Sequence, residues 1–239
     1  MFLNKFKRVL EYASNKELLI ARLKKLPISF FEDLLELKRI LPVIDNIFDI
    51  GANDGEFTIA ANYVYPKSKI YCFEPLPEKA KKLKEIYAIN RVMGEIYDIA
   101  LSSSKGRAVF YQYKYDRLSS FLTPGTKLKQ LFGDRSQFNE ITVQKDLFDN
   151  IFELKQNEKT LVKIDTQGSE LDVLKGMVKN LKYINAILCE VNFDNLYMGQ
   201  TSFIELISFL YEYEFRRFYQ LDKAVVNGTV SWCDLVFMK

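Results

Sequence analysis

The sequence predicts an α/β fold in which a mostly parallel sheet carries helices on both faces. Short apolar segments of strand length alternate with segments of helical spacing through most of the 239 residues. Alternation of this kind is typical of a parallel sheet covered by helices. The last two strand-like segments are joined by Asn227-Gly228, a dipeptide that favours a hairpin turn. We therefore expect one antiparallel strand in the sheet.

The individual elements follow from the spacing of apolar residues and from turn residues. Residues 1–41 show helical spacing that Pro27 interrupts. Strands are expected over residues 46–50, 69–74, 96–101, 108–113, 160–165, 184–191, 215–220 and 233–238. Helices are expected over residues 57–65, 77–90, 170–181 and 202–213. Residues 114–145 are rich in polar residues, glycine and proline, so we expect a loop-rich cover over the active site there.

The composition excludes several kinds of chemistry. The chain has no histidine, which excludes histidine-based metal sites, Ser-His triads and an imidazole general base. Cys72, Cys189 and Cys233 each lie in an apolar segment, so we expect buried free thiols typical of a reducing compartment. The sequence shows no signal-peptide pattern and no apolar stretch of the ~18 residues that a membrane span needs. We therefore expect a cytoplasmic protein.

The charge is unevenly distributed along the chain. The formal net charge of +3 is too small to indicate a nucleic-acid partner. Residues 1–25 carry +5, whereas the other 214 residues sum to −2. The favoured interpretation of this basic N-terminal helix is a cover over the sheet with a solvated outer face. The alternative is weak peripheral contact with an anionic membrane surface.

The most informative motif is Asp-Ile-Gly-Ala-Asn-Asp-Gly at residues 49–55, which follows the first strand and opens a helix. Gly51 and Gly55 allow a tight turn and a close approach of the backbone to a ligand. A dinucleotide fingerprint has a middle glycine where this chain has Asn53, and Asp54 beside the helix start would repel a pyrophosphate. The same acid suits a ligand with an ammonium and a sulfonium. The loop thus favours S-adenosylmethionine over a nicotinamide cofactor.

Two further strand ends complete the expected cofactor site. Glu74 ends the second strand, and an acid at that place binds the ribose hydroxyls in α/β nucleotide sites. At the end of the third strand, Ile99 and Ala100 could wall an adenine, and Asp98 could accept a hydrogen bond from its amino group. The alternative interpretation is a tight turn, a solvated acid and an ordinary strand end. The candidate cofactor-binding residues are Asp49, Gly51, Asn53, Asp54, Gly55, Glu74, Asp98, Ile99 and Ala100.

Six segments occur in a characteristic order along the chain. They are Asp-Ile-Gly-Ala-Asn-Asp-Gly at 49–55, Phe-Glu-Pro at 73–75, Ala-Leu-Ser at 100–102, Lys-Ile-Asp-Thr-Gln-Gly-Ser-Glu at 163–170, Glu-Val at 190–191 and Asp-Leu-Val-Phe at 234–237. This ordered set resembles the FkbM-type methyltransferases. The resemblance implies a Rossmann-like class I methyltransferase fold, with a seven-stranded sheet in the order 3-2-1-4-5-7-6 and strand 7 antiparallel. It leaves residues 1–42 as an N-terminal helical extension and residues 43–239 as the methyltransferase domain.

The resemblance also implies a function. It implies S-adenosylmethionine as methyl donor and a hydroxyl of a sugar, glycolipid or other small molecule as acceptor. One departure is Gln167, because the family commonly has Asp-x-Glu-Gly where this chain has Asp165-Thr-Gln-Gly168. The alternatives are a non-catalytic binding module that keeps the fold and, less favoured, a nicotinamide-dependent oxidoreductase.

Asp165 and Glu190 are the expected catalytic pair. Without histidine, the base must be a carboxylate, lysine or tyrosine, unless a metal acidifies the acceptor. Both acids lie at ends of strands that are neighbours in the implied order, so we expect them in one crevice at the carboxyl edge of the sheet. They could position the acceptor hydroxyl or serve as base. A hard cation such as Mg2+ is the less favoured alternative. The alternative interpretation is that Asp165 caps the next helix or bonds a backbone amide, and that Glu190 pairs with Lys163 or another cation.

Overall fold

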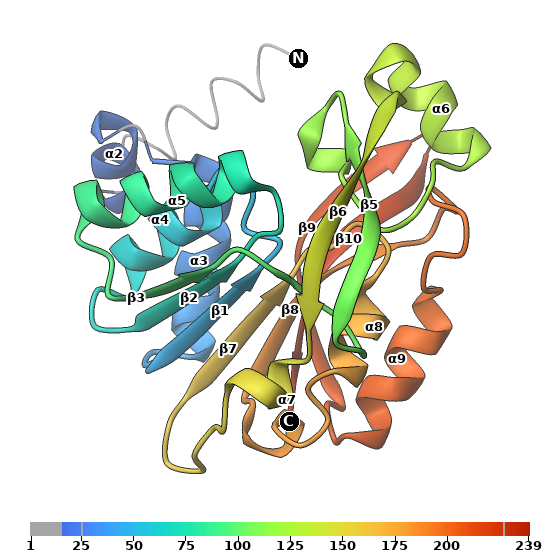
Figure 1. Ribbon diagram of the computed structural model, residues 1–239. Helices are drawn as coiled ribbons and strands as arrows, with labels where there is room; N and C mark the ends of the chain where they lie inside the picture. Colours follow the sequence, from blue (N-terminus) through green and yellow to red (C-terminus); the bar gives the residue numbers. More distant parts are fainter. Residues whose placement is uncertain (1–15, 25, 227) are drawn as a thin grey trace.

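Seven strands form the central sheet of the computed structural model, which describes residues 16–24, 26–226 and 228–239 (Figure 1). Their order is β3-β2-β1-β7-β8-β10-β9. The strands are β1 (Asn46–Ile50), β2 (Lys69–Phe73), β3 (Gly94–Tyr97), β7 (Thr160–Ile164), β8 (Ala186–Asn192), β9 (Arg217–Val226) and β10 (Thr229–Met238). β10 runs antiparallel to β8 and β9, and the other neighbours are parallel. In chain order this is 3-2-1-4-5-7-6 with the seventh strand antiparallel, so the predicted topology is confirmed.

Helices cover both faces of this sheet (Figure 1). One face carries α2 (Lys16–Leu23), α3 (Ile28–Ile40), α4 (Glu56–Val64) and α5 (Pro77–Asn90), and the other carries α7 (Phe148–Ile151), α8 (Glu170–Lys175) and α9 (Phe203–Glu212). The central strand β1 supplies both cores, since Ile47 packs with the first group of helices and Phe48 with the second. Successive side chains of a strand point to opposite faces. β1 and β7 are therefore buried along their whole length.

The helix α3 is amphipathic and shares a core with the sheet. Phe31, Leu34 and Leu37 recur at three-residue spacing and are buried, which gives the apolar stripe of a helix on a globular core. They belong to the same apolar cluster as Phe57 of α4. The helix expected within residues 1–15 lies outside the described residues, as does Asn227 of the expected hairpin turn. The domain boundary at residue 42 stays a prediction.

A second sheet corrects the expectation of a loop-rich cover. Its order is β4-β6-β5, formed by β4 (Ala100–Leu101), β6 (Phe138–Asp146) and β5 (Gly106–Tyr113). β6 was expected to be loop because it lacks an alternating apolar pattern, and of its nine residues only Val143 is buried. Its strand conformation comes from antiparallel pairing with β5 from Gly106–Lys145 to Tyr113–Phe138. The helix α6 (Thr126–Phe132) and the short 3-10 turns η1 (Asp116–Leu118) and η2 (Gly133–Ser136) fill the rest of this region.

Several expected element boundaries are also corrected. The strand expected over 96–101 is divided between two sheets, because β3 ends at Tyr97 and the chain then enters β4. The helix expected over 170–181 is shorter, since α8 ends at Lys175 before Gly176. A Cβ on Gly176 would lie 2.2 Å from the carbonyl oxygen of Ser102, so the chain passes too close to β4 for any other residue.

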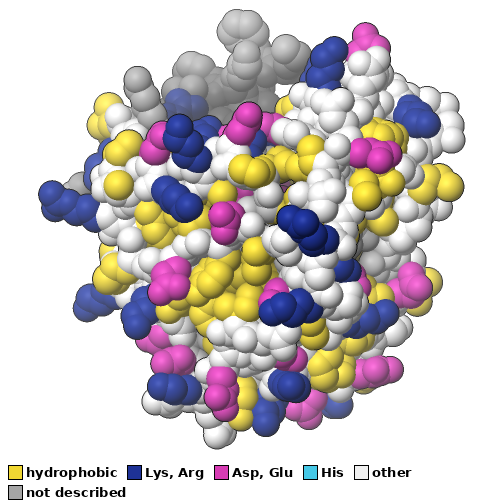
Figure 2. All heavy atoms as spheres, viewed as in Figure 1, with side chains coloured by type: hydrophobic (Ala, Val, Ile, Leu, Met, Phe, Trp, Pro, Cys, Tyr) yellow, Lys and Arg dark blue, Asp and Glu magenta, His cyan; other side chains and the backbone are white. Residues whose placement is uncertain are grey.

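The cysteines, the helix lengths and the surface charges can be compared with the expectations drawn from composition. Cys72, Cys189 and Cys233 are buried and free, which confirms the expectation of free thiols. Among the described residues, every helix is too short or too polar to cross a bilayer. Figure 2 shows acidic and basic side chains interspersed over the viewed face, without a continuous basic area among the residues that the structure describes. Nucleic-acid-binding proteins usually concentrate their basic residues.

Candidate active site

A cavity of about 620 Å³ lies at the carboxyl edge of the central sheet, where β1, β2, β7 and β8 end. Open α/β sheets bind their ligands at this edge, and the volume suits a small-molecule ligand. Seven of the predicted site residues line the cavity: Gly51, Asn53, Asp54, Glu74, Ala100, Asp165 and Glu190. The other four, Asp49, Gly55, Asp98 and Ile99, do not line it.

Glycine residues shape the loop between β1 and α4. Gly51 has a φ of +75°, and a Cβ there would lie 2.0 Å from the carbonyl oxygen of Asp165. Gly55 has a φ of +73°, and a Cβ would meet the side chains of Leu83 and Ile86 at 2.8 Å. Since glycine alone adopts positive φ without strain and leaves this space free, the loop packs directly against the end of β7 and against α5. Gly55 therefore acts through packing rather than from the cavity wall.

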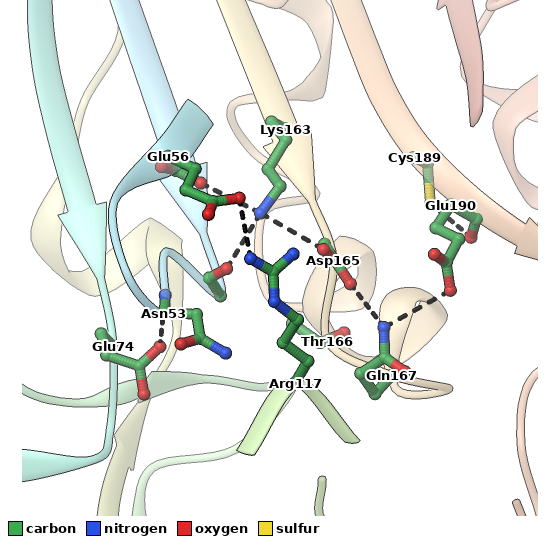
Figure 3. A network of polar contacts seen from close by, with 12 residues as sticks. Asn53, Glu56, Glu74, Arg117, Lys163, Asp165, Thr166, Gln167, Cys189 and Glu190 are labelled. Atoms are coloured by element: carbon green, nitrogen blue, oxygen red, sulfur yellow. Dashed lines mark hydrogen bonds and ion pairs between the residues drawn. The ribbon is translucent and has the colours of Figure 1, made fainter. Parts of the chain in front are cut away.

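Glu74 is held at the end of β2 by backbone amides. Its Oε2 accepts a hydrogen bond of 2.8 Å from the Asn53 amide, and its Oε1 accepts one of 3.0 Å from the Leu76 amide. Burial raises the pKa of Glu74 to about 7, although the two amides lower it. The buried Oδ1 of Asn53 has no hydrogen-bond donor among the described residues. Glu74 and Asn53 lie side by side (Figure 3) and together offer acceptor atoms to a ligand with hydroxyl groups.

Asp49 lies beneath the loop and acts on it through Lys163. The Asp49 side chain is fully buried, its Oδ1 lies 3.1 Å from Lys163 Nζ, and its Oδ2 accepts a 2.7 Å hydrogen bond from Thr58. Lys163 also donates to the Gly51 carbonyl at 2.9 Å and lies 3.6 Å from Asp165 Oδ2. Burial alone would lower the pKa of Lys163, but the two acids raise it above its usual value. Lys163 is thus a fixed cation that links the loop to β7.

Asp54 is half-buried at the cavity rim, and its charge is already paired. Its Oδ1 accepts hydrogen bonds from Lys79 at 2.8 Å and from Lys82 at 2.7 Å. Burial opposes the shift, but these two lysines lower the pKa of Asp54 below its usual value. The predicted attraction of Asp54 for a cationic ligand stays a prediction, and the two lysines weaken its basis.

Asp165 and Glu190 line the same cavity and are joined by Gln167 (Figure 3). Gln167 Nε2 donates to Asp165 Oδ1 at 2.7 Å and lies 3.4 Å from Glu190 Oε1. Tyr197 holds the other end of the amide, because its hydroxyl donates to Gln167 Oε1 at 2.9 Å. Burial, followed by the charges of Asp165 and Asp234, raises the pKa of Glu190 well above its usual value.

The ordinary roles that the sequence allowed for these two acids are taken by other residues. Glu170, rather than Asp165, accepts hydrogen bonds from the backbone amides of Gly168 at 2.9 Å and Thr166 at 3.2 Å. Glu190 accepts from Asn192 Nδ2 at 3.0 Å, whereas Lys163 pairs with Asp49 and Asp165. Asp165 is therefore free of a capping role and faces the cavity.

The sequence of this chain matches a known methyltransferase domain. The model of the methyltransferase FkbM domain matches residues 49–217 of the chain. The chain belongs to the FkbM methyltransferase family. The matched region contains the glycine loop, Glu74, Gln167 and both acids of the expected catalytic pair.

Individual relatives of this FkbM-domain protein are named as methyltransferases. It is 27% identical over 176 residues to the 2-O-methyltransferase NoeI of Sinorhizobium fredii, a match that covers 70% of this chain and 72% of NoeI. It is 28% identical over 151 residues to the hexuronic acid methyltransferase AglP of Haloferax volcanii, with 62% of this chain and 56% of AglP covered. The crystal structure of the N-terminal domain of EvdMO1 with SAH bound covers 90% of this chain and 83% of that domain. With a TM-score of 0.53 and 9% identity, it shows a shared fold.

Two of the predicted cofactor-binding residues, Asp98 and Ile99, lie away from the cavity. Asp98 is exposed in the link between β3 and β4, and Ile99 packs against the core around β1 and β7. The apolar wall next to Ala100 is built instead from Phe73, Leu76, Leu101, Phe110 and Phe121. Leu76 could have been found from the sequence, because it follows Glu74-Pro75 directly. Phe110 comes from the second sheet, whose position the sequence did not predict.

Three further cavity residues have no counterpart in the sequence expectations. Arg117 pairs with Glu56 at 2.8 Å and reaches between the Glu74 side and the Asp165 side of the cavity (Figure 3). Apart from Lys163, it is the one cation among the described residues that line the cavity. Asp33 of α3 and Asp222 of β9 also line it. Nothing in their local sequence marks them, because α3 and β9 are brought to the cavity only by the fold.

Proposed function

We propose that this protein transfers the methyl group of S-adenosylmethionine to a hydroxyl of a sugar, a glycolipid or another small molecule. The observation that carries the proposal is the single cavity that contains both the Glu74–Asn53 acceptor pair and the Asp165–Gln167–Glu190 group. The name of NoeI, a 2-O-methyltransferase, supports an oxygen as the methylated atom, and the name of AglP, a hexuronic acid methyltransferase, supports a sugar-derived acceptor.

The residues of the inner cavity fit the donor. Glu74 and Asn53 present oxygen acceptors for the two ribose hydroxyls. Ala100, Leu101 and Phe110 form an apolar wall for the adenine. Arg117 offers a cation for the carboxylate of the donor, and the backbone of the glycine loop allows the donor to approach closely. The predicted cofactor contacts of Gly51, Asn53, Glu74 and Ala100 remain part of this proposal, whereas Asp49 and Gly55 support the loop from behind.

The two acids have different parts in the reaction. When bound, S-adenosylmethionine supplies an electrophilic methyl group on a sulfonium. Lys163 lies 3.6 Å from Asp165 Oδ2, and no described cation lies as close to Glu190, so we assign the role of general base to Asp165. Asp165 accepts the proton of the acceptor hydroxyl. The oxygen of that hydroxyl would gain the methyl group as the bond from the methyl carbon to the donor sulfur breaks, which would leave S-adenosylhomocysteine. Glu190, whose pKa is raised by burial and by the neighbouring acids, orients the acceptor.

A divalent cation is not needed for this arrangement. Among the described residues, no three histidine, cysteine, aspartate or glutamate side chains are grouped so that they could hold a metal ion. The NH2 group of Gln167 lies between the two acids, where a shared cation would otherwise be bound. Lys163 and Gln167 instead supply the positive charge and the hydrogen-bond donor beside Asp165.

The test is calorimetric titration of the purified protein with S-adenosylmethionine, S-adenosylhomocysteine and NADH. We expect the two sulfur ligands to bind, NADH not to bind, and Glu74→Ala to weaken both sulfur ligands. Glu153→Gln is a matched control, because Glu153 is exposed and away from the cavity. Binding of NADH in place of the sulfur ligands would favour the oxidoreductase alternative. Folded protein that binds neither sulfur ligand would overturn the proposal and favour a non-catalytic module.

A further inference from the structure

The outer part of the cavity has a different character from the part that fits the donor. Its wall is formed by residues from four elements: Asp33 from α3, Glu190 and Asn192 from β8, Asp222 from β9, and Trp232 and Asp234 from β10. Asp234 and Glu190 are direct partners across the β8–β10 pair. Under the proposed function, this outer part is where the acceptor binds, since the glycine loop and Glu74 belong to the donor.

The acids of the outer part lack the cations that pair with acids elsewhere in the cavity. Asp54 pairs with two lysines, Glu56 pairs with Arg117, and Asp165 lies beside Lys163. In contrast, no lysine or arginine of the described residues forms an ion pair with the following four acids of the outer part: Asp33, Glu190, Asp222 and Asp234. The negative charge that Asp33, Asp222 and Asp234 carry therefore has no ion-pair partner within the part of the chain that the structure describes.

Burial and mutual repulsion both raise the pKa values of these acids. Burial, then the charge of Asp222, raises the pKa of Asp33 to about 7. Burial, then the charges of Asp165, Asp33 and Asp222, raises the pKa of Asp234 to about 7. The acids thus form one connected group rather than isolated charges on the surface. A positive charge placed among them would relieve this repulsion.

A second observation is independent of charge. The buried Oδ1 of Asn192 has no hydrogen-bond donor among the described residues, while its Nδ2 is used by Glu190. A buried acceptor without a donor is costly. Asn192 lines the same wall as the four acids, so the outer part offers mainly acceptor atoms. It therefore suits a ligand that is rich in donors.

The remaining feature of the wall is aromatic. Trp232 precedes Asp234 by two residues on β10, and both line the cavity, so their side chains share one face of the strand. A tryptophan ring attracts cations through its π face. It also offers a flat apolar surface on which the C–H face of a sugar ring can pack.

We propose that the acceptor is an amino sugar, whose protonated amine lies among Asp33, Asp222 and Asp234 while a neighbouring hydroxyl faces Asp165. This inference rests on the proposed methyl transfer and narrows its acceptor class. It excludes uronic acids, phosphorylated sugars and other anionic acceptors, because their charge would add to the negative charge of this wall. The relative AglP is named as a hexuronic acid methyltransferase, so the two proteins would differ in the charge of their acceptors.

The experiment compares three matched probes on the full-length protein saturated with S-adenosylhomocysteine. The probes are D-glucosamine, neutral D-glucose and anionic D-glucuronate, and binding is measured by calorimetry and by thermal shift at neutral pH. We expect glucosamine to bind at least about tenfold more tightly than glucose, and glucuronate to bind most weakly. Asp222→Asn and Asp234→Asn should each reduce the preference for the amine and leave the affinity for S-adenosylhomocysteine unchanged.

The control variant is Glu153→Gln, which removes an exposed acid outside the cavity and should keep the preference. Equal or tighter binding of glucose or glucuronate would overturn the inference, and so would the absence of binding by all three probes. Binding of the amine that persists in both variants would show adventitious ion pairing and would also overturn it. Failure of S-adenosylhomocysteine to bind is a separate result, because it contradicts the proposed methyl transfer itself.

Discussion

Gln167 donates a hydrogen bond of 2.7 Å from its Nε2 to Asp165 Oδ1. The same nitrogen lies 3.4 Å from Glu190 Oε1, so a neutral amide separates two acids at the position where the resemblance implied a glutamate. Gln167 has a φ of +55°, and its backbone carbonyl accepts a hydrogen bond of 2.8 Å from Ser120. Both its side chain and its backbone are therefore fixed, which makes it a positioning residue for Asp165.

Replacement of Gln167 by glutamate tests this role. In Gln167→Glu, three carboxylates face one another and Asp165 loses a donor, so at least one acid must take up a proton. We expect kcat to fall at least about tenfold with little change in the affinity for S-adenosylhomocysteine. The fall should be partly reversed by added Mg2+, because three carboxylates suit a hard cation. An unchanged kcat would show that the amide does not position the base.

Substitution of the two acids should separate their parts. Asp165→Asn removes the proton acceptor, and we expect kcat to fall by about 10²–10⁴-fold. Glu190→Gln resembles the protonated acid in shape and hydrogen bonding, so its kcat should fall about tenfold or less. The check is a pair of full kinetic curves with donor affinity measured in parallel. A larger loss in Glu190→Gln than in Asp165→Asn would reverse the assignment.

Donor binding should depend on pH through Glu74. Its pKa is raised to about 7 by burial, and the ionised form is the better acceptor for ribose hydroxyls. As pH falls from 8 to 6, Glu74 takes up a proton, and we expect the affinity for S-adenosylhomocysteine to fall by up to about tenfold. Glu74→Gln should bind more weakly at pH 8 and show no such slope. An equal slope in that variant would assign the titration to another group.

The acidic wall should reduce stability at high pH. The pKa values of Asp33 and Asp234 are raised to about 7 from about 3.9 in the unfolded chain. Between these values the folded state binds more protons than the unfolded state, so the free energy of unfolding falls as pH rises from about 4 to about 7. Asp234→Asn should therefore raise Tm at pH 8 by about 2–4 °C, which corresponds to about 1 kcal/mol, and should have a smaller effect at pH 5. Thermal melts at both pH values check this. A lower Tm for the variant at pH 8 would contradict it.

Arg117 should contribute to donor affinity. It pairs with Glu56 at 2.8 Å and lies in the middle of the cavity (Figure 3). We expect Arg117→Ala to weaken S-adenosylmethionine about tenfold, since a hydrogen-bonded ion pair to the donor carboxylate is lost. Arg107→Ala is the matched control, because Arg107 is exposed on β5 and does not line the cavity. Equal affinity in both variants would show that Arg117 pairs with Glu56 alone.

The site residues that the sequence predicted are those that lie at the ends of apolar strands. The glycine loop, Glu74 and Asp165 each follow directly from the end of an apolar strand, and strand ends of a parallel sheet meet at one edge. Glu190 was found for the same reason, and the resemblance supplied the strand order. The expected places of these residues in one cavity agree with the structure.

The features that the sequence did not predict depend on contacts between distant segments. Asp98 and Ile99 were assigned to the cavity on the assumption of a continuous strand, but the chain leaves the central sheet at Tyr97. Asp54 was expected to have a free charge, and only the packing of α5 brings Lys79 and Lys82 to it. Asp33 was missed because it belongs to a helix and lies 132 residues before Asp165 in the sequence.

The contact between Gly51 and Asp165 has a consequence for how such a protein diversifies. A Cβ on Gly51 would lie 2.0 Å from the Asp165 carbonyl oxygen, so the loop that faces the donor and the segment that carries the base cannot shift independently. The outer wall belongs to α3, β8, β9 and β10 and does not depend on that contact. Under the proposed function, mutations in the wall could exchange one acceptor for another while the distance between methyl group and base stays the same. Selection for a new acceptor would then change the outer wall, while the geometry of methyl transfer would be inherited unchanged.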